Sequence, residues 1–151
     1  MKKFMFGFAV FVVVLAITKE SIADTNKDQK FLEALEKMHE SYNTCEKEFG
    51  QQPGYVAVEG HNNIKKEDEE KVAAFTLCFL SKLGLISKNG DIIEDGVRSF
   101  LTDFLGDTDR EKELVQKVLT ICKPLVESQL IPQYKALAFQ QCKDKHIKPD
   151  H

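Results

Sequence analysis

The chain has 151 residues, of which 42% are hydrophobic and 30% charged, and its formal net charge is −3. This length is enough for one domain with a hydrophobic core but not for two domains of ordinary size, which excludes most multidomain enzymes. Acidic and basic residues are mixed along the chain, as they are in 65–71. A nucleic-acid-binding protein instead concentrates Lys and Arg on one face to displace counterions, so we expect no nucleic acid as a partner.

Residues 1–23 have the pattern of a secretory signal peptide. Two lysines precede the apolar run 4–17, which is too short to span a bilayer comfortably. Ser21 and Ala23 are small residues at the positions that signal peptidase reads, so we expect cleavage after Ala23. The product, residues 24–151, is expected to be secreted and extracellular, without stable membrane insertion. Cleavage removes three lysines and one glutamate, which leaves 18 basic and 23 acidic residues and a net charge of −5.

After residue 23 the apolar residues follow helical spacing, with almost no alternation typical of strands. From about Thr25 they recur at steps of four and three, which predicts a first helix with Cys45 on its buried face. The segment 49–63 is rich in Gly, Pro and Asn and can hold only a short or irregular helix. The next segment, from about Glu67 to Leu83, is apolar on almost all sides and predicts a central, buried helix.

Gly84 is placed to end that helix in a left-handed conformation. Asn89-Gly90 predicts a helix-to-helix turn, because its flanks are too short and polar for an independent hairpin. A short helix should follow, with a spacing of three and four that directs one face inward. Its apolar residues are Val97, Phe100, Leu101, Phe104 and Leu105.

Two further helices complete the predicted fold. Thr108 and Glu111 form a capping box, which predicts a helix from near Asp109 to about Pro124, where the proline should end or kink it. Pro132 suits the first turn of the last helix. In that helix three residues share one face, with Phe139 beside it: Tyr134, Ala138 and Cys142. The sequence thus predicts an all-α protein, a compact bundle of about six helices.

All four cysteines lie after the expected cleavage site, each on the apolar face of a predicted helix: Cys45, Cys78, Cys122 and Cys142. An even number of cysteines in a small exported domain implies disulfides, which here would join helices, and three connectivities remain open. There is no Cys-x-x-Cys and no His at ligand spacing beside a Cys, so we expect no metal and no cofactor. An oxidising compartment also leaves no thiolate for catalysis.

The cysteine spacing and the segment 78–90 resemble the insect odorant-binding protein family (pheromone-binding and general odorant-binding proteins), specifically its four-cysteine, or Minus-C, branch. Six-cysteine members have three residues between their second and third cysteines and eight between their fifth and sixth. Those spacings place the missing pair at Ala74 and Gln133, and the other four cysteines fall where the first, third, fourth and sixth belong. Segment 78–90 is similar to the family's cysteine, helix end, Lys-x-Gly and Asn-Gly turn. The resemblance covers nearly the whole chain after residue 23.

This resemblance implies two disulfides, Cys45 with Cys78 and Cys122 with Cys142. Each would close a loop of roughly twenty to thirty residues and contribute roughly 3 to 4 kcal/mol in the chain-entropy model, which would let the protein tolerate an incompletely filled core. The second-to-fifth bridge is absent, so the helices that carry Ala74 and Gln133 lack a crosslink. We therefore expect a softer pocket than six-cysteine members have.

The resemblance also implies a function: a secreted carrier that binds small hydrophobic molecules (odorants, pheromones or other semiochemicals) in an internal cavity and transports them through aqueous fluid. Burying apolar ligand surface contributes roughly 25 cal/mol per Å², enough for micromolar binding of a volatile of about ten carbons. We expect a monomer or weak homodimer, with a membrane receptor as a candidate downstream partner. The candidate wall residues are Phe75, Phe79, Leu101, Phe104, Val115, Leu119, Tyr134 and Phe139.

Other interpretations remain open. For any single wall candidate plain core packing is the favoured interpretation, because every helical domain needs such residues, although Tyr134 also offers a hydroxyl to a ligand. An enzyme such as a phospholipase is not expected, because the chain has no Gly-x-Ser-x-Gly and no His-Glu-x-x-His. A venom, seminal or signalling factor on the same scaffold would have a filled core and an exposed apolar patch. The tail 143–151 has one large apolar residue and a proline, a poor plug for a cavity, and the four histidines are expected to have no switching role.

Overall fold

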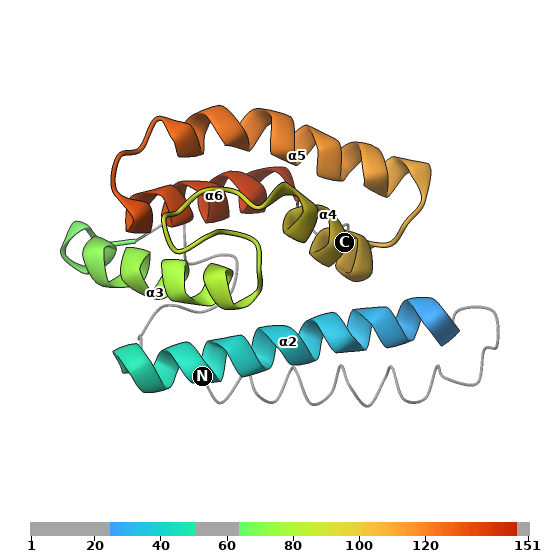
Figure 1. The fold of residues 1–151 in the computed structure, drawn as a ribbon, viewed down its shortest axis with the longest axis horizontal. Coiled ribbons are helices and arrows are strands. Elements are labelled where there is room, and N and C mark those ends of the chain that lie inside the picture. Colours follow the sequence, from blue (N-terminus) through green and yellow to red (C-terminus); the bar gives the residue numbers. More distant parts are fainter. Residues whose placement is uncertain (1–24, 51–63, 148–151) are drawn as a thin grey trace.

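The computed structural model of this chain describes residues 25–50 and 64–147. Within these two ranges it has five α-helices, labelled α2 to α6, and one 3-10 turn (Figure 1). The predicted all-α class is confirmed. The expected signal peptide lies outside the described residues, as does nearly all of the expected irregular segment 49–63.

The first two helices begin close to the predicted positions. α2 spans Thr25–Phe49, and α3 spans Glu69–Lys82 after the 3-10 turn Lys66–Asp68. Gly84 has φ +78°, the left-handed conformation expected of the residue that ends α3. The prediction that α3 is a central, buried helix is correct only in part, because Cys78 and its neighbour Leu77 are half-buried. The reason is that α3 packs against α2 and α6, which leaves part of its circumference uncovered.

The connection from α3 to α4 contains more structure than the predicted helix-to-helix turn. Ile86 and Ile92 form one antiparallel β-bridge, and the Ser87 amide donates a hydrogen bond of 2.8 Å to the Asp91 carbonyl. The turn at its tip is closed by the Gly90 amide, 2.9 Å from the Ser87 carbonyl. A single bridge is possible on flanks this short because Ile86 is buried in the core, so the hairpin is not independent.

The three remaining helices are α4, Glu94–Leu105; α5, Asp109–Glu127; and α6, Pro132–His146. The predicted end of α5 at about Pro124 is wrong, because the helix runs through the proline to Glu127. A proline has no amide hydrogen to donate to the carbonyl oxygen four residues earlier. Here that oxygen belongs to Thr120, which is exposed, so water can replace the missing donor. The extra turn also places Val126, which is buried, in the core.

The predicted capping box does not form, although α5 does start at Asp109 with Thr108 as its N-cap residue. The Thr108 side chain makes no capping hydrogen bond, and Oε2 of Glu111 is buried without a partner. The Glu111 carboxylate lies instead against Gly106. A Cβ placed on this glycine would be 3.6 Å from Oε1 of Glu111. The carboxylate therefore covers the loop before the helix rather than bonding the Thr108 amide.

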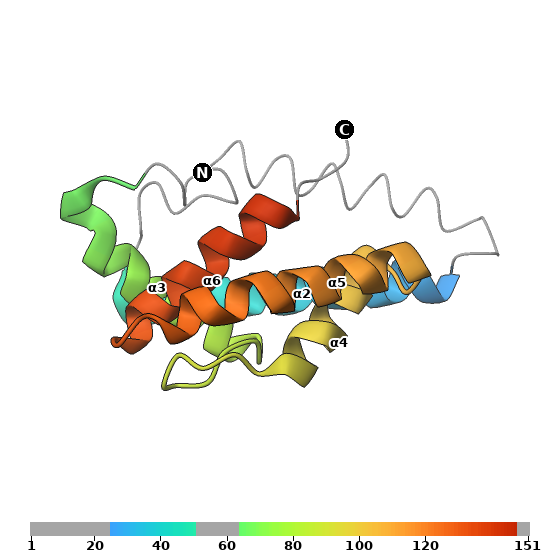
Figure 2. The same cartoon turned by 90° about the horizontal axis from the view of Figure 1, so that it is seen from above.

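The five helices pack as a closed ring, in the order α2, α3, α6, α5, α4 and back to α2. Each packs against its two neighbours in this order, and within the described ranges no pair across the ring makes more than marginal contact. Figure 1 shows α5 and α2 on opposite sides, with α3 and α4 between them at opposite ends. Seen from above, α4 and α6 lie on opposite sides of α5 (Figure 2). The ring encloses the apolar faces of its helices.

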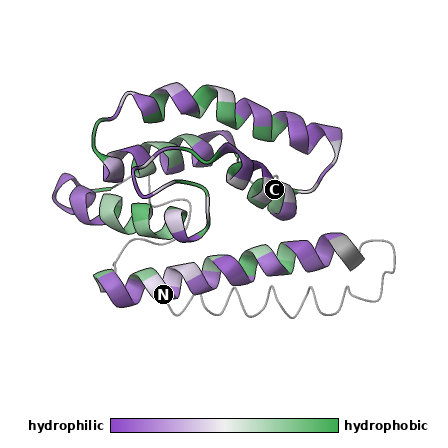
Figure 3. Ribbon diagram, viewed as in Figure 1, coloured by the Kyte–Doolittle hydropathy of each residue, from purple (hydrophilic) through white to green (hydrophobic). Residues whose placement is uncertain are grey.

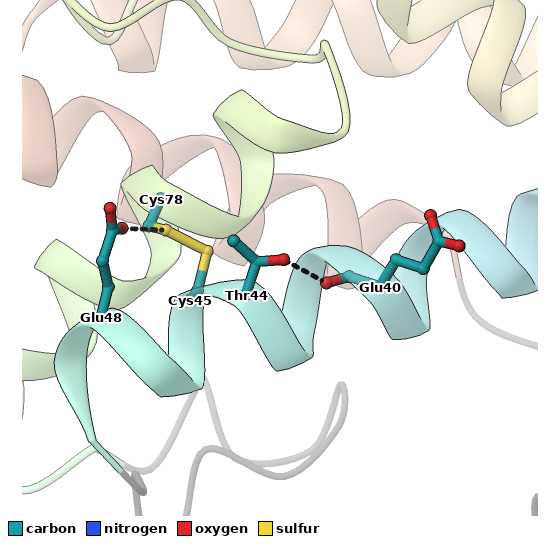
Figure 4. The surroundings of a disulfide bond; sticks show 5 residues. All are labelled: Glu40, Thr44, Cys45, Glu48 and Cys78. Atoms are coloured by element: carbon teal, nitrogen blue, oxygen red, sulfur yellow. Dashed lines mark hydrogen bonds between the residues drawn. A yellow bond between two sulfur atoms is a disulfide. The ribbon is translucent and has the colours of Figure 1, made fainter.

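Two disulfides join neighbouring helices of the ring. Cys45 of α2 bonds Cys78 of α3, and Cys122 of α5 bonds Cys142 of α6. These are the same pairs that the family resemblance implies. Figure 4 shows the first bond, with Oε2 of Glu48 3.3 Å from the Cys78 sulfur. Two of the five helix contacts are therefore covalent, and the other three depend on packing.

The hydrophobic core draws on all five helices and on the connection between α3 and α4. Figure 3 shows apolar colouring along most of α3, whereas α2 and α5 alternate between apolar and polar. This difference follows from position, since α2 and α5 present one face to solvent. The largest completely buried side chains are Phe75, Phe139, Leu80, Leu85 and Ile86.

Gly90 provides a direct test of how the α3–α4 connection docks on α6. It is buried with φ +86°, and a Cβ at this position would lie 2.8 Å from the Pro132 carbonyl oxygen. Gly90→Ala should lower the free energy of unfolding by about 2 to 4 kcal/mol, measured by urea denaturation, because backbone strain and overpacking add.

The matched control is Gly84→Ala, where φ is +78° but a Cβ would have open space. It should cost about 1 kcal/mol, the strain of the left-handed conformation alone. Equal losses in the two variants would show that the connection does not pack tightly on Pro132.

Candidate ligand-binding site

The eight predicted wall residues lie on four of the five ring helices. Phe75 and Phe79 are on α3, and each remaining helix except α2 provides a further pair: Leu101 and Phe104 on α4, Val115 and Leu119 on α5, Tyr134 and Phe139 on α6. All except Phe104 belong to the core cluster or pack directly against it. Because these four helices are consecutive in the ring, the structure brings seven of the residues into one apolar assembly.

The wall candidates differ in how completely protein atoms cover them. Phe75 and Phe139 have no exposed surface, so every part of each ring is in contact with protein. Phe104 and Tyr134 are half-buried. A side chain that contacts a ligand needs surface that the protein itself does not cover, so these two are better placed to do so than the fully covered residues.

The sequence prediction overlooked the contribution of α2. The ring of Tyr42 packs edge-on against Phe75 and Phe79, with centroid distances of 5.3 and 6.4 Å. Nearer the start of α2, Phe31 lies 5.2 Å from Phe104 of α4. Both α2 residues stand at predicted apolar positions, so the periodicity places them on the buried face but does not show which aromatic rings they meet.

Phe104 occupies a different position from the other candidates. Its ring is parallel to that of Phe100, one turn earlier on α4, at a centroid distance of 6.2 Å. With Phe31 these rings form an aromatic group between the first turns of α2 and the last turns of α4. This group is half-buried, and it involves the first turns of α2, whereas Cys45 lies in the last turns of that helix.

The phenol of Tyr42 is held in its neutral form by its surroundings. Burial raises its pKa above the ordinary value of 10.0, and the negative charge of Glu46, one turn further along α2, raises it further. Tyr42 is therefore a neutral side chain at any physiological pH, with an apolar ring and a hydroxyl that can both donate and accept a hydrogen bond.

One polar side chain is buried in the middle of α6, and the sequence prediction did not identify it. Gln140 is 5% exposed and donates hydrogen bonds from Nε2 to both carboxylate oxygens of Asp144, at 3.1 and 3.3 Å. Lys143 approaches the same carboxylate at 3.1 Å. Oε1 of Gln140 is buried and has no hydrogen-bond partner. α6 also contains Gln133 and Gln141, and nothing in the sequence distinguishes Gln140 from these as a buried residue.

A shallow hollow of about 280 Å³ lies on the outer surface between α4 and α5. Leu119, a predicted wall residue, forms part of its floor, which shows that this side chain lies between the core and the surface. An ion pair of 3.6 Å between Lys123 and Glu94 crosses the hollow. It is a polar surface feature rather than an apolar cavity.

In the two described ranges no group of three or more His, Cys, Asp and Glu side chains is arranged to hold a metal ion. The same residues include no helix with the length and hydropathy needed to cross a membrane. His39 is exposed on α2 and lies 3.1 Å from the Asn43 amide, and His146 ends α6. The other two histidines lie outside the described residues.

Comparison with known proteins adds two matches. The model of the PBP/GOBP family matches residues 22–146, most of the chain. General odorant-binding protein 68 of Anopheles gambiae is 30% identical over 73 residues, which cover 48% of this chain and 34% of that protein. The matched stretch thus spans about a third of the length of this relative. No solved structure gives a significant match.

The position of Tyr42 makes a testable prediction about alkaline pH. Because its pKa is raised on folding, the folded chain binds the phenolic proton more tightly than the unfolded chain. This contribution to stability is present below pH 10 and is lost as the pH rises through the raised pKa. In urea denaturation the stability difference between the native chain and Tyr42→Phe should therefore shift in favour of the variant above about pH 10. A difference that stays constant from about pH 8 to 11.5 would contradict the raised pKa of Tyr42 in the folded chain.

Proposed function

Because this chain belongs to the PBP/GOBP family, a family of small-ligand carriers, we propose that it is a secreted carrier of small hydrophobic molecules such as odorants, pheromones or other semiochemicals. It would hold them inside the helix ring and carry them through aqueous extracellular fluid. We expect it to act as a monomer or weak homodimer, without catalysis.

The observation that supports this proposal best is the ring itself. Among the described residues, five helices that pack mainly with their ring neighbours enclose a space that apolar side chains from different helices must fill. Such a space can accept an apolar guest by small shifts of helices or side chains, whereas in a layered bundle each helix face is covered by another helix. The two disulfides hold α2 to α3 and α5 to α6 during such shifts.

The half-buried aromatic side chains are the strongest candidates for ligand contact. Phe104 and Tyr134 come from the predicted set, and Phe31, Tyr42 and Phe100 join them because they also combine an apolar environment with uncovered surface. Rings of this kind give a guest a large contact area with little loss of side-chain entropy. Phe75, Phe79 and Phe139 would form the layer behind them.

We also propose that the chain is of the four-cysteine, Minus-C type. Ala74 lies on α3 and Gln133 on α6, two helices that pack against each other but that neither disulfide joins. The contact between these helices relies on packing, and Ala73 of α3 and Ala136 of α6 are both fully buried. A pocket bounded by this contact would adapt to ligands of different shapes.

A second function, action through a protein partner, is favoured by one observation. Large apolar side chains are exposed in the last turn of α5 and in the turn that leads to α6: Leu125 at 50%, Leu130 at 93% and Ile131 at 49%. A venom, seminal or signalling factor would need such a patch, although single exposed apolar residues are also normal. The two functions differ in whether the ring accepts a small ligand.

The deciding experiment is displacement of a fluorescent apolar probe from the oxidised protein by a panel of volatiles, at pH 7 and pH 5. A carrier should show saturable displacement at micromolar concentrations, because an enclosed apolar ligand removes most of its surface from water. Failure of any probe to bind, with both disulfides intact, would contradict the carrier function and favour a protein partner.

The proposed Minus-C type makes a separate prediction. In the double variant Ala74→Cys/Gln133→Cys the new cysteines should pair, and the added crosslink should raise the free energy of unfolding by about 2 to 4 kcal/mol. The range of ligands that displace the probe should become narrower, because α3 and α6 can no longer shift apart. Two free thiols in a thiol assay of the oxidised variant would show that these positions are not those of the missing bridge. Gln129→Cys/Ala74→Cys, with one cysteine in the α5–α6 turn, is a control for the added thiols.

A further inference from the structure

Gln140 combines deep burial with an unused hydrogen-bond acceptor. It lies in the middle of α6, one turn after the fully buried Ala136 and directly after Phe139, on the helix that packs between α3 and α5. Its amide oxygen is covered by protein and accepts no hydrogen bond. An unpaired buried acceptor is destabilising, so most proteins keep few of them.

The orientation of this amide is determined by its neighbour. Asp144 is 7% exposed and its carboxylate can only accept hydrogen bonds, so the nitrogen of Gln140 must face it and the oxygen must point away. Lys143 balances the charge of Asp144 at 3.1 Å. The three side chains thus form a neutral group that holds Oε1 as a fixed acceptor.

Other buried polar atoms are less suited to receive a ligand. Thr76 is fully buried but donates its hydroxyl to the Val72 carbonyl at 2.7 Å. Ser81 and Glu111 each have an unpaired oxygen, but both residues are only half-buried, and a serine hydroxyl can rotate toward another partner. Of these side chains, only Gln140 combines deep burial with an unpaired atom whose orientation is fixed.

We propose that Gln140 selects ligands that carry a hydrogen-bond donor, with alcohols as the preferred class. This specificity rests on the proposed carrier function and names the chemistry of its cargo. A ligand hydroxyl donates to Oε1 and relieves the unpaired acceptor when the core opens to admit it. An ester, an ether or an aldehyde offers only acceptors, which would face the amide oxygen without a proton between them.

The test compares ligands of similar size with and without a hydroxyl hydrogen. The competitors are 1-decanol, its methyl ether and decane, each measured by probe displacement on the full chain with both disulfides formed. We expect 1-decanol to bind about two- to tenfold more tightly than the ether, the net effect of one hydrogen bond to a buried acceptor. In Gln140→Met this preference should vanish, while the affinity for the ether stays within about twofold of that of the native chain.

Gln129→Met is the matched control, because Gln129 is exposed in the turn between α5 and α6 and should keep the preference. Gln140→Met removes the amide that donates to the buried Asp144 carboxylate, which could prevent folding. In that case the double variant Gln140→Met/Asp144→Leu, which also removes the carboxylate, is used in place of the single variant. Equal binding of alcohol and ether to the native chain would overturn the role of Gln140, as would a preference that survives in the variant that folds.

The same data separate this proposal from the carrier function. Binding of decane and the ether without any alcohol preference means that the chain is a carrier but that Gln140 does not select its ligand. If none of the three compounds displaces the probe, the carrier function fails, and the role of Gln140 fails with it.

Discussion

The bond between Cys45 and Cys78 is the constraint on which closure of the helix ring depends. α2 packs against α3 and α4 and against no other helix to a comparable extent within the described residues. The bond lies at the same edge as the aromatic contacts of Tyr42 with Phe75 and Phe79, so covalent and packing forces act together there. With that edge held, α2 can close over the centre of the ring while its other contact, at Phe104, stays half-exposed. The wall of the proposed site is thus rigid at one end and more open at the other.

Stability and ligand contact make opposite demands on the same set of apolar residues. Side chains such as Phe75 and Phe139 contribute most to stability because no surface is left uncovered. Residues that keep part of their surface free, such as Phe104 and Tyr134, contribute less to the core but are available to a guest. The disulfides reduce this conflict, since they stabilise the fold without filling space at its centre. A ring held partly by covalent bonds can therefore leave more of its interior to adaptable contacts.

Local patterns in the sequence predicted the helices well, and the contacts between distant residues less well. Apolar periodicity placed α2, α4 and α6, and Gly84 and Asp109 mark helix ends as expected. The capping box failed because Glu111 lies against Gly106 in the folded chain, and Pro124 failed to end α5 because the lost donor affects only an exposed carbonyl. Of the candidate site, the apolar face of each helix could be predicted. The order of the helices in the ring, and therefore which rings meet Tyr42, depends on packing over long sequence separations. Gln140 carries no sequence pattern at all, because its role depends on Asp144 and on what covers it.

The order of the helices around the ring differs from their order along the chain. α6 is the last helix in the sequence, yet it lies between α3 and α5. During synthesis from the N-terminus, Cys45 and Cys78 are therefore both available before α6 exists, whereas Cys122 must wait for Cys142. Until Pro132–His146 has emerged, α3 and α5 have no common neighbour and the apolar faces of both are exposed. The ring thus closes only once residues 132–146 have been made, and a product that stops before residue 132 would lack the helix that joins α3 to α5.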